Sequence, residues 1–298
     1  MTDRHDREQR IPRQDTFDLD IEVDLDAAPA AVWAALTEAA ELMNWFPFTA
    51  AVEPGPGGSI RLGWDEGIEG TCAITAWEPE RHIGTSWPWH HAPEGKEAPV
   101  LALDYHLEGR GGRTRLRLIH SGFPAGDDWG DLLDGTSRGW AFELRSLRHY
   151  LARHRGTRRR MVLVKTPVGV SAEAGWKRFW SRDGVVAEGA AAPLEEDARL
   201  RFVTPTGHEL AGRIDLCHPP TDLAMTVEGM GDALLRVNLD RWGGPQDDLA
   251  LRLHLGTFGM PEPEAAALQA SWQRMVDGIF AGTQESFAPG RRGIGRQP

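Results

Sequence analysis

The sequence predicts an α+β protein made of two domains, in each of which a curved antiparallel sheet wraps around a long C-terminal helix. Three observations lead to this prediction. The chain has 298 residues, which is enough for two ordinary domains of roughly 100 to 150 residues each. One order of strand-like and helix-like segments occurs twice, once in each half of the chain. Each copy closes with apolar residues three and four positions apart, which indicates one face of a helix.

The first copy is expected over residues 17–154. Apolar and polar residues alternate in Phe17–Leu25, as in a half-buried strand, and Ala28-Pro29 then opens a helix. Hairpin patterns follow, with strands expected at 59–64, twice within 70–89, at 101–107 and at 113–120. The closing helix carries Leu133, Thr136, Trp140, Leu144, Leu147 and Leu151.

The second copy is expected over residues 161–282. A strand at 161–166 and a helix around 174–179 open it, and strands follow at 198–203, twice within 210–230, at 233–239 and at 249–255. Leu268, Trp272, Val276 and Ile279 indicate its closing helix. The remaining segments are expected to be a disordered N-terminal arm (1–16), a linker (155–160) and a C-terminal tail (283–298).

Composition excludes several classes of function. The net charge of −11 disfavours binding to nucleic acids, whose affinity depends on cationic contacts. No apolar run is long enough to cross a membrane, and the first residues lack the apolar stretch of a secretory signal, so we expect a cytoplasmic protein. Cys72 and Cys217 lie far apart, and no phosphate, dinucleotide or metal-binding motif occurs in its required context. We therefore expect no cofactor and no metal.

Several segments of the first copy resemble a known family. They are Trp45-Phe46, TAWEPERHIGTSW (75–87), TRLRLIHSGF (114–123) and GWAFELRSLRHYL (139–151). In this order they are similar to the activator of Hsp90 ATPase homologue (AHSA1) branch of the START-like/Bet v 1-like SRPBCC superfamily. The second copy resembles it as a degenerate repeat without the Trp-Phe step. The resemblance implies two helix-grip (Bet v 1/START-like) domains with a cavity between sheet and long helix. That superfamily contains binders, transfer proteins, cyclases and hydrolases.

His120 is the polar residue of most interest. In a strand it shares a face with Leu116 and Leu118, so we expect it to point inward. There it could hydrogen-bond a ligand or act as a general acid or base, in a dyad with Glu143 or alone. A structural histidine with a satisfied hydrogen bond is the alternative. In the second copy the equivalent position is Leu255, and His254 falls on the opposite face.

Aromatic residues are concentrated in the first copy and could line a pocket or simply fill the core. With His120 and one leucine they make up the predicted ligand-binding set: Trp45, Phe46, Trp64, Trp87, Tyr105, His120, Trp140 and Leu144. The function that this set favours is binding or carriage of an apolar small molecule. The alternatives are a cyclase-like or hydrolase-like enzyme that uses His120, and an interaction protein that associates with a chaperone or with itself.

Overall fold

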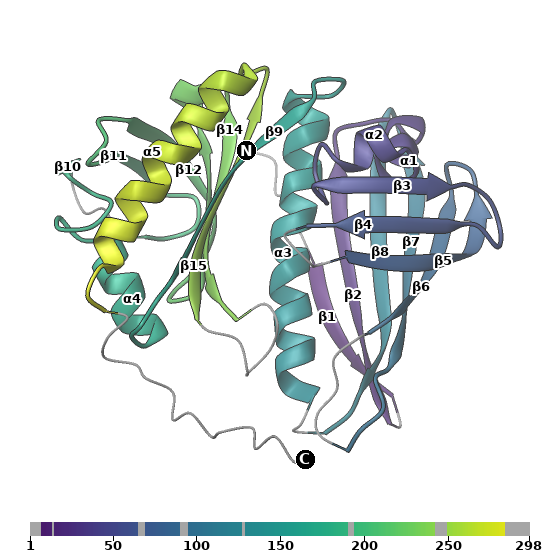
Figure 1. The fold of residues 1–298 in the computed structure, drawn as a ribbon. Helices are drawn as coiled ribbons and strands as arrows, with labels where there is room; N and C mark the ends of the chain where they lie inside the picture. The colour runs from purple at the N-terminus through teal and green to yellow at the C-terminus, as the bar shows by residue number, and fades with distance from the viewer. Residues whose placement is uncertain are drawn as a thin grey trace, which may run out of the picture. The chain divides into compact units, whose positions relative to one another are not determined.

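The computed structural model describes residues 7–13, 15–64, 69–89, 95–126, 129–189, 194–241 and 249–283. The chain divides into two compact units, residues 1–159 (unit 1) and 160–298 (unit 2). Each unit has one large sheet and a long helix that lies against it, α3 (Gly130–Arg153) in unit 1 and α5 (Glu262–Phe280) in unit 2 (Figure 1). The predicted α+β fold with two helix-grip domains is confirmed.

Unit 1 contains an eight-stranded sheet in the order β1-β2-β8-β7-β6-β5-β4-β3. Its elements are β1 (Arg7–Pro12), β2 (Thr16–Leu25), α1 (Pro29–Thr37), α2 (Ala39–Leu42), β3 (Thr49–Glu53), β4 (Ser59–Gly63), β5 (Glu69–Glu78), β6 (His82–Pro88), β7 (Val100–Arg110), β8 (Arg113–Pro124) and α3. Burial alternates along β5, β7 and β8, so one face of the sheet carries the core and the other carries polar side chains.

The N-terminal segment differs from the sequence prediction. Residues up to 16 were expected to be disordered, but Arg7–Pro12 form β1, which pairs antiparallel with β2 from Arg7 opposite Glu22 to Pro12 opposite Phe17. All residues of β1 except Ile11 are exposed. An edge strand of this kind gains its stability from the backbone ladder and buries no apolar face, so hydropathy does not reveal it.

Unit 2 repeats the topology of unit 1. Its elements are β9 (Arg159–Pro167), α4 (Ala172–Phe179), β10 (Glu188–Gly189), β11 (Arg199–Val203), β12 (Glu209–His218), β13 (Asp222–Val227), β14 (Ala233–Asp240), β15 (Ala250–Phe258) and α5. The order β9-β15-β14-β13-β12-β11-β10 matches the order β2-β8-β7-β6-β5-β4-β3 of unit 1 strand for strand. The predicted tandem repeat is therefore confirmed.

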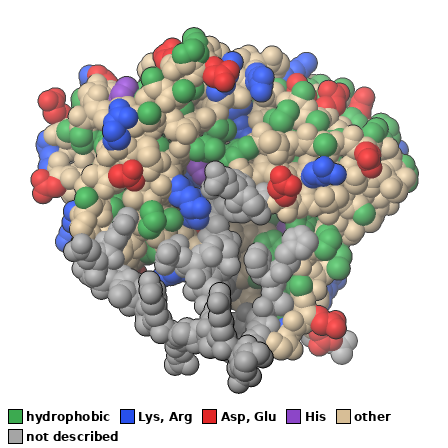
Figure 2. Space-filling model, viewed as in Figure 1, with side chains coloured by type: hydrophobic (Ala, Val, Ile, Leu, Met, Phe, Trp, Pro, Cys, Tyr) green, Lys and Arg blue, Asp and Glu red, His purple; other side chains and the backbone are tan. Residues whose placement is uncertain are grey.

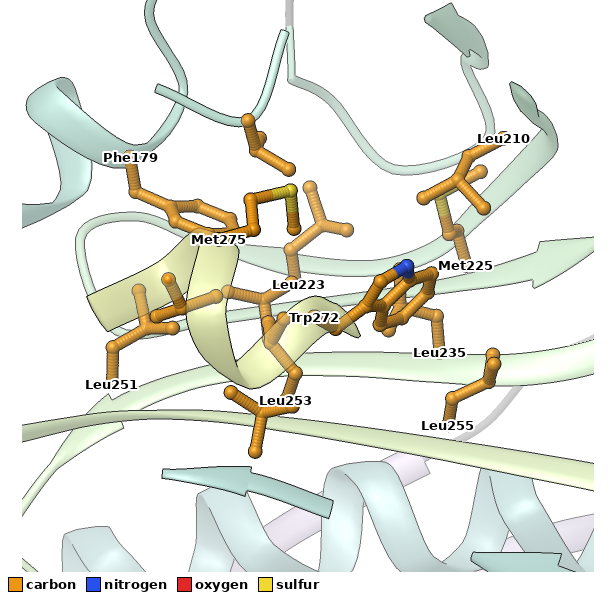
Figure 3. Packing of buried hydrophobic residues seen from close by; sticks show 14 of the residues in the cluster. Phe179, Leu210, Leu223, Met225, Leu235, Leu251, Leu253, Leu255, Trp272 and Met275 are labelled. Carbon is orange, nitrogen blue, oxygen red and sulfur yellow. The ribbon is translucent and has the colours of Figure 1, made fainter. Parts of the chain in front are cut away.

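The core of unit 2 lies between its sheet and α5. Trp272 of α5 is 1% exposed and packs among leucines of β12 to β15 (Figure 3). Leu255 belongs to this core, as the alignment of the two copies predicts, whereas His254 pairs with Arg236 and so lies on the other face of the sheet. Unit 2 thus has an apolar residue at the position that His120 occupies in unit 1.

Acidic and basic side chains are interspersed over the visible face of each unit and are not gathered by sign (Figure 2). Among the described residues, no helix combines the length and the apolar character that crossing a membrane requires.

Candidate functional site

His120 lies on the inner face of the unit 1 sheet, as its parity with Leu118 predicts. It stands opposite Leu19 of β2 and Leu103 of β7, and it is 5% exposed. Its ring Nδ1 accepts a hydrogen bond of 2.9 Å from the indole Nε1 of Trp140 on α3. The strand and the long helix are therefore joined through this pair.

The hydrogen bond determines the protonation of the imidazole. An indole N–H can only donate, so Nδ1 must be unprotonated, and the proton of the neutral ring resides on Nε2. Burial lowers the pKa of His120 to about 3, because the charged form loses its hydration. The ring is neutral at physiological pH, and its buried Nε2–H has no acceptor among the described residues.

Aromatic rings extend outward from Trp140 between the sheet and α3. The Trp140 ring lies 6.0 Å from Tyr105 of β7 in an edge-on arrangement and 5.6 Å from Phe46, on which it stacks. Phe46 in turn meets Trp64 edge-on at 5.2 Å, and Trp64 lies 5.8 Å from Trp87 of β6. Offset and edge-on arrangements at these spacings are favourable for aromatic rings. Trp45 stacks on Phe46 and completes the group. The structure therefore brings six of the predicted residues together with His120: Trp45, Phe46, Trp64, Trp87, Tyr105 and Trp140.

Three members of this aromatic cluster are only partly buried: Phe46, Trp64 and Trp87. The Trp87 indole lies over Gly70 of β5, where an added Cβ would come within 2.9 Å of the ring. Gly70 therefore provides the space that Trp87 occupies. The partly exposed rings lie at the outer end of the cluster, and Trp140, Tyr105 and His120 lie at its buried end.

Two predicted site residues have structural roles. Trp45 is fully buried, its indole donates to the carbonyl of Ala35, and its own carbonyl accepts from Ser146 of α3. Its contacts join the first helices to α3, so its polar groups are already bonded. Leu144 is buried one turn after Trp140, where it contributes apolar surface.

Two aspects of the site differ from the sequence analysis. The partner of His120 Nδ1 is Trp140 and Nε2 has none among the described residues, so the dyad with Glu143, which the sequence left open as one possibility, is not formed. Phe123, which sequence reasoning missed, meets the His120 ring edge-on at 4.8 Å. Strict alternation would place it on the opposite face, but the β2–β8 register shifts between Phe17 and Leu19 and so returns Phe123 to the inner face.

Cys72 of β5, a potential nucleophile, is unreactive in the folded state. Burial raises the pKa of the Cys72 thiol to about 12, so the thiolate is not available at neutral pH. A distinct polar group, His82, Asp104 and His106, lies on the opposite face of the sheet and contains the atoms that could hold a metal ion.

Unit 2 contains a related but weaker arrangement. Trp272 of α5 donates to His208 Nδ1 at 3.4 Å, and this nitrogen also faces the hydroxyl of Thr206 at 2.8 Å. The cavity between α5 and the sheet, which Trp180, Thr204 and Trp272 help to line, has a volume of ≈ 10 Å³. Such a space is about large enough for one water molecule.

Comparison with known proteins gives a family-model match within unit 1. The family model described as Activator of Hsp90 ATPase homolog 1-like protein matches residues 26–152. No curated protein matched the chain.

Several solved structures are similar to the chain. CalU16 from Micromonospora echinospora is 24% identical, with 50% of this chain and 84% of that chain covered and a TM-score of 0.39. The di-domain ARO/CYC BexL from the BE-7585A biosynthetic pathway is 12% identical, with 91% and 99% covered and a TM-score of 0.42. The Aha1 dimer from Colwellia psychrerythraea is 21% identical, with 47% and 98% covered and a TM-score of 0.38.

The family match extends from the end of β2 to the end of α3, and these are the elements that hold His120, Trp140 and the aromatic cluster. Unit 2 repeats the order of these elements. Residues 26–152 of unit 1 therefore match the Activator of Hsp90 ATPase homolog 1-like model, and unit 2 repeats the strand order of that region.

Proposed function

We propose that unit 1 binds an apolar aromatic small molecule that carries a hydrogen-bond acceptor. The observation that supports this most strongly is the buried Nε2–H of His120, which has no acceptor among the described residues. A buried donor without a partner costs roughly 1–3 kcal/mol. A carbonyl or hydroxyl oxygen of a ligand would remove that cost, so the site is selective for an apolar body with one acceptor.

The aromatic cluster supports the rest of the proposal. Phe46, Trp64 and Trp87 are partly exposed, and in the proposal they form the entrance. A planar ligand that passes them would stack on Trp140 and Tyr105 and reach His120 with its acceptor. Aromatic walls with a single oriented polar group are typical of small-molecule sites.

The test compares two probes that differ only in an acceptor, 2-acetylnaphthalene and 2-ethylnaphthalene. Binding is followed by quenching of tryptophan fluorescence in the full-length protein. We expect the ketone to bind about three- to tenfold more tightly, since a net hydrogen bond contributes about 0.5–1.5 kcal/mol. In His120→Leu, which places the unit 2 residue in unit 1, the preference should disappear while the hydrocarbon still binds.

Two controls make the result specific. Leu255→Ile, at the equivalent position of unit 2, should keep the preference for the ketone. Circular dichroism and thermal melting establish that His120→Leu is folded. An equal preference in wild type and His120→Leu, or no binding of either probe to the wild type, contradicts the proposal.

A cyclase-type enzyme is the second candidate. The protonation of His120 favours a mechanism in which this residue acts as a hydrogen-bond donor and not as a base. With its proton on Nε2 and a pKa of about 3, His120 does not serve as a general base near pH 7. A fixed neutral donor does polarise a carbonyl and so acidifies the neighbouring C–H bonds. Faster deuterium exchange at the methyl group of bound 2-acetylnaphthalene, lost in His120→Leu, would favour the enzyme, and exchange at the uncatalysed rate would favour the carrier.

A further inference from the structure

The outer face of the unit 1 sheet carries a compact group of three potential metal ligands. We propose that His82, Asp104 and His106 form a binding site for a divalent transition-metal ion such as Zn²⁺. One ligand atom from each residue lies within 4.8 Å of the others. The site is separate from the proposed ligand site, because these residues face away from the side of the sheet that carries His120.

Strand register brings the three residues together. His82 of β6 stands directly opposite His106 of β7, and Gly84 stands opposite Asp104. Residues two apart in a strand share a face, and directly opposed residues are the closest neighbours across a ladder. The His82 and His106 rings are accordingly stacked, with 4.2 Å between centroids and 9° between planes.

Gly84 lets the carboxylate of Asp104 reach His82. A Cβ at position 84 would lie 2.7 Å from Asp104 Oδ1, so the carboxylate occupies the space that a side chain there would fill. It lies across β6, and its Oδ1 is 2.7 Å from His82 Nε2. A metal ion would replace the proton that these two atoms now share.

The donor set suits a borderline metal. Two imidazole nitrogens and one carboxylate oxygen bind Zn²⁺ at about 2.0–2.2 Å and leave at least one position open. Binding requires the two stacked rings to rotate out of their near-parallel arrangement, so that both imidazole nitrogens and the carboxylate point at one ion. The second ring nitrogen of His82, Nδ1, lies 4.0 Å from the carboxylate of Glu78. A carboxylate behind a ligating histidine orients the ring and raises its basicity.

The surroundings are also compatible with a bound cation. The nearby positive side chain, Arg117, stands opposite His106 and is held by a bidentate pair of hydrogen bonds to Asp20, which balance its charge. The side chains of His82 and Asp104 are 20% and 30% exposed. An ion can therefore reach the group from solvent, while partial burial strengthens its attraction to Asp104.

The test is calorimetric titration of the untagged full-length protein with ZnCl₂ after treatment with a chelator. We expect one ion per chain at this site, with affinity reduced at least tenfold in His82→Ala, His106→Ala and Asp104→Asn. Gly84→Ala should also weaken binding, because it displaces the Asp104 carboxylate without removing a ligand.

A matched control comes from the described pair His149 and His154, whose rings lie 5.1 Å apart. His154→Ala should bind Zn²⁺ as the wild type does. Each variant's melting curve without metal establishes that it is folded, and His106→Gln replaces His106→Ala if the alanine variant is not. Absence of Zn²⁺ binding in the wild type, or binding that survives the changes to His82, Asp104 and His106, overturns the proposal.

Discussion

A neutral histidine inside an apolar interior is a costly residue unless both ring nitrogens have partners. In His120 one nitrogen is satisfied by Trp140 and the other is buried without an acceptor. An apolar residue would avoid this cost, as Leu255 does at the equivalent position of unit 2. The difference between the two positions supports a role for His120 in recognition, because packing alone does not require it.

The protonation of His120 predicts a specific dependence of stability on pH. The folded protein has a pKa of about 3 at this residue, whereas an unfolded chain has an ordinary value near 6.5. Between these values the unfolded state binds the additional proton. His120 therefore has no effect above about pH 6.5, and below it lowers the free energy of unfolding by up to about 1.4 kcal/mol per pH unit.

Urea unfolding between pH 7.5 and 4.5 checks this prediction. The slope of the unfolding free energy against pH should be smaller in His120→Leu than in the wild type. Leu118→Val, a change at a fully buried neighbour on the same strand, should lower stability at every pH and leave the slope intact. Equal slopes in wild type and His120→Leu would mean that His120 is protonated in the folded protein.

Among the elements of unit 1, α3 is held at its C-terminal end by a buried network of hydrogen bonds. The hydroxyl of Tyr150 donates to Glu41 of α2 and accepts from the side chain of Asn44 and from the backbone N–H of Gly156. Asn44 in turn accepts from the backbone N–H of Arg159. One hydroxyl thus connects α2, α3 and the segment that follows α3, and it helps to fix the helix that carries Trp140.

Tyr150→Phe should therefore destabilise unit 1 by about 1–3 kcal/mol, because buried donors lose their acceptor. The chain has two tyrosines, and Tyr105 supplies the matched control. It is also buried, but its hydroxyl makes no hydrogen bond among the described residues, so Tyr105→Phe should change stability by less than about 0.5 kcal/mol. The free energy of unfolding in urea measures both, and equal losses would contradict the assigned role of Tyr150.

Elements that bury one face were predictable from the sequence, and elements or contacts that depend on register were not. Alternation in β2 and β8 and the apolar stripe of α3 arise from burial, so hydropathy reports them directly. The exposed strand β1 has no such pattern. His82 and His106 are far apart along the chain, and only the pairing of β6 with β7 brings them together. The sequence contained one signal for this group of metal ligands, namely polar residues at alternate positions of two neighbouring strands.

At the scale of the whole molecule, the chain uses one topology twice and has a histidine at the position of His120 in one copy and a leucine in the other. Both units have the same strand order and a closing helix with a buried tryptophan, Trp140 or Trp272. The alternation of side chains along β8 fixes which face of the sheet His120 takes, and this alternation was sufficient to predict it. The bond to Trp140 depends in addition on the rotation of α3 about its axis, which a pattern of apolar residues determines only within a broad stripe.

The residues at the position of His120 in the two units predict how many ligand molecules one chain binds. Unit 2 has Leu255 at the position of His120, and the cavity described beside Trp272, of ≈ 10 Å³, holds no more than about one water molecule. We therefore expect one molecule of 2-acetylnaphthalene per chain in a calorimetric titration. Val237→Ile adds a methylene group to the lining of the unit 2 cavity and should leave both stoichiometry and affinity unchanged. Two molecules per chain, or weaker binding in Val237→Ile, would place a binding site in unit 2 and show that the residue at the position of His120 does not distinguish the two copies.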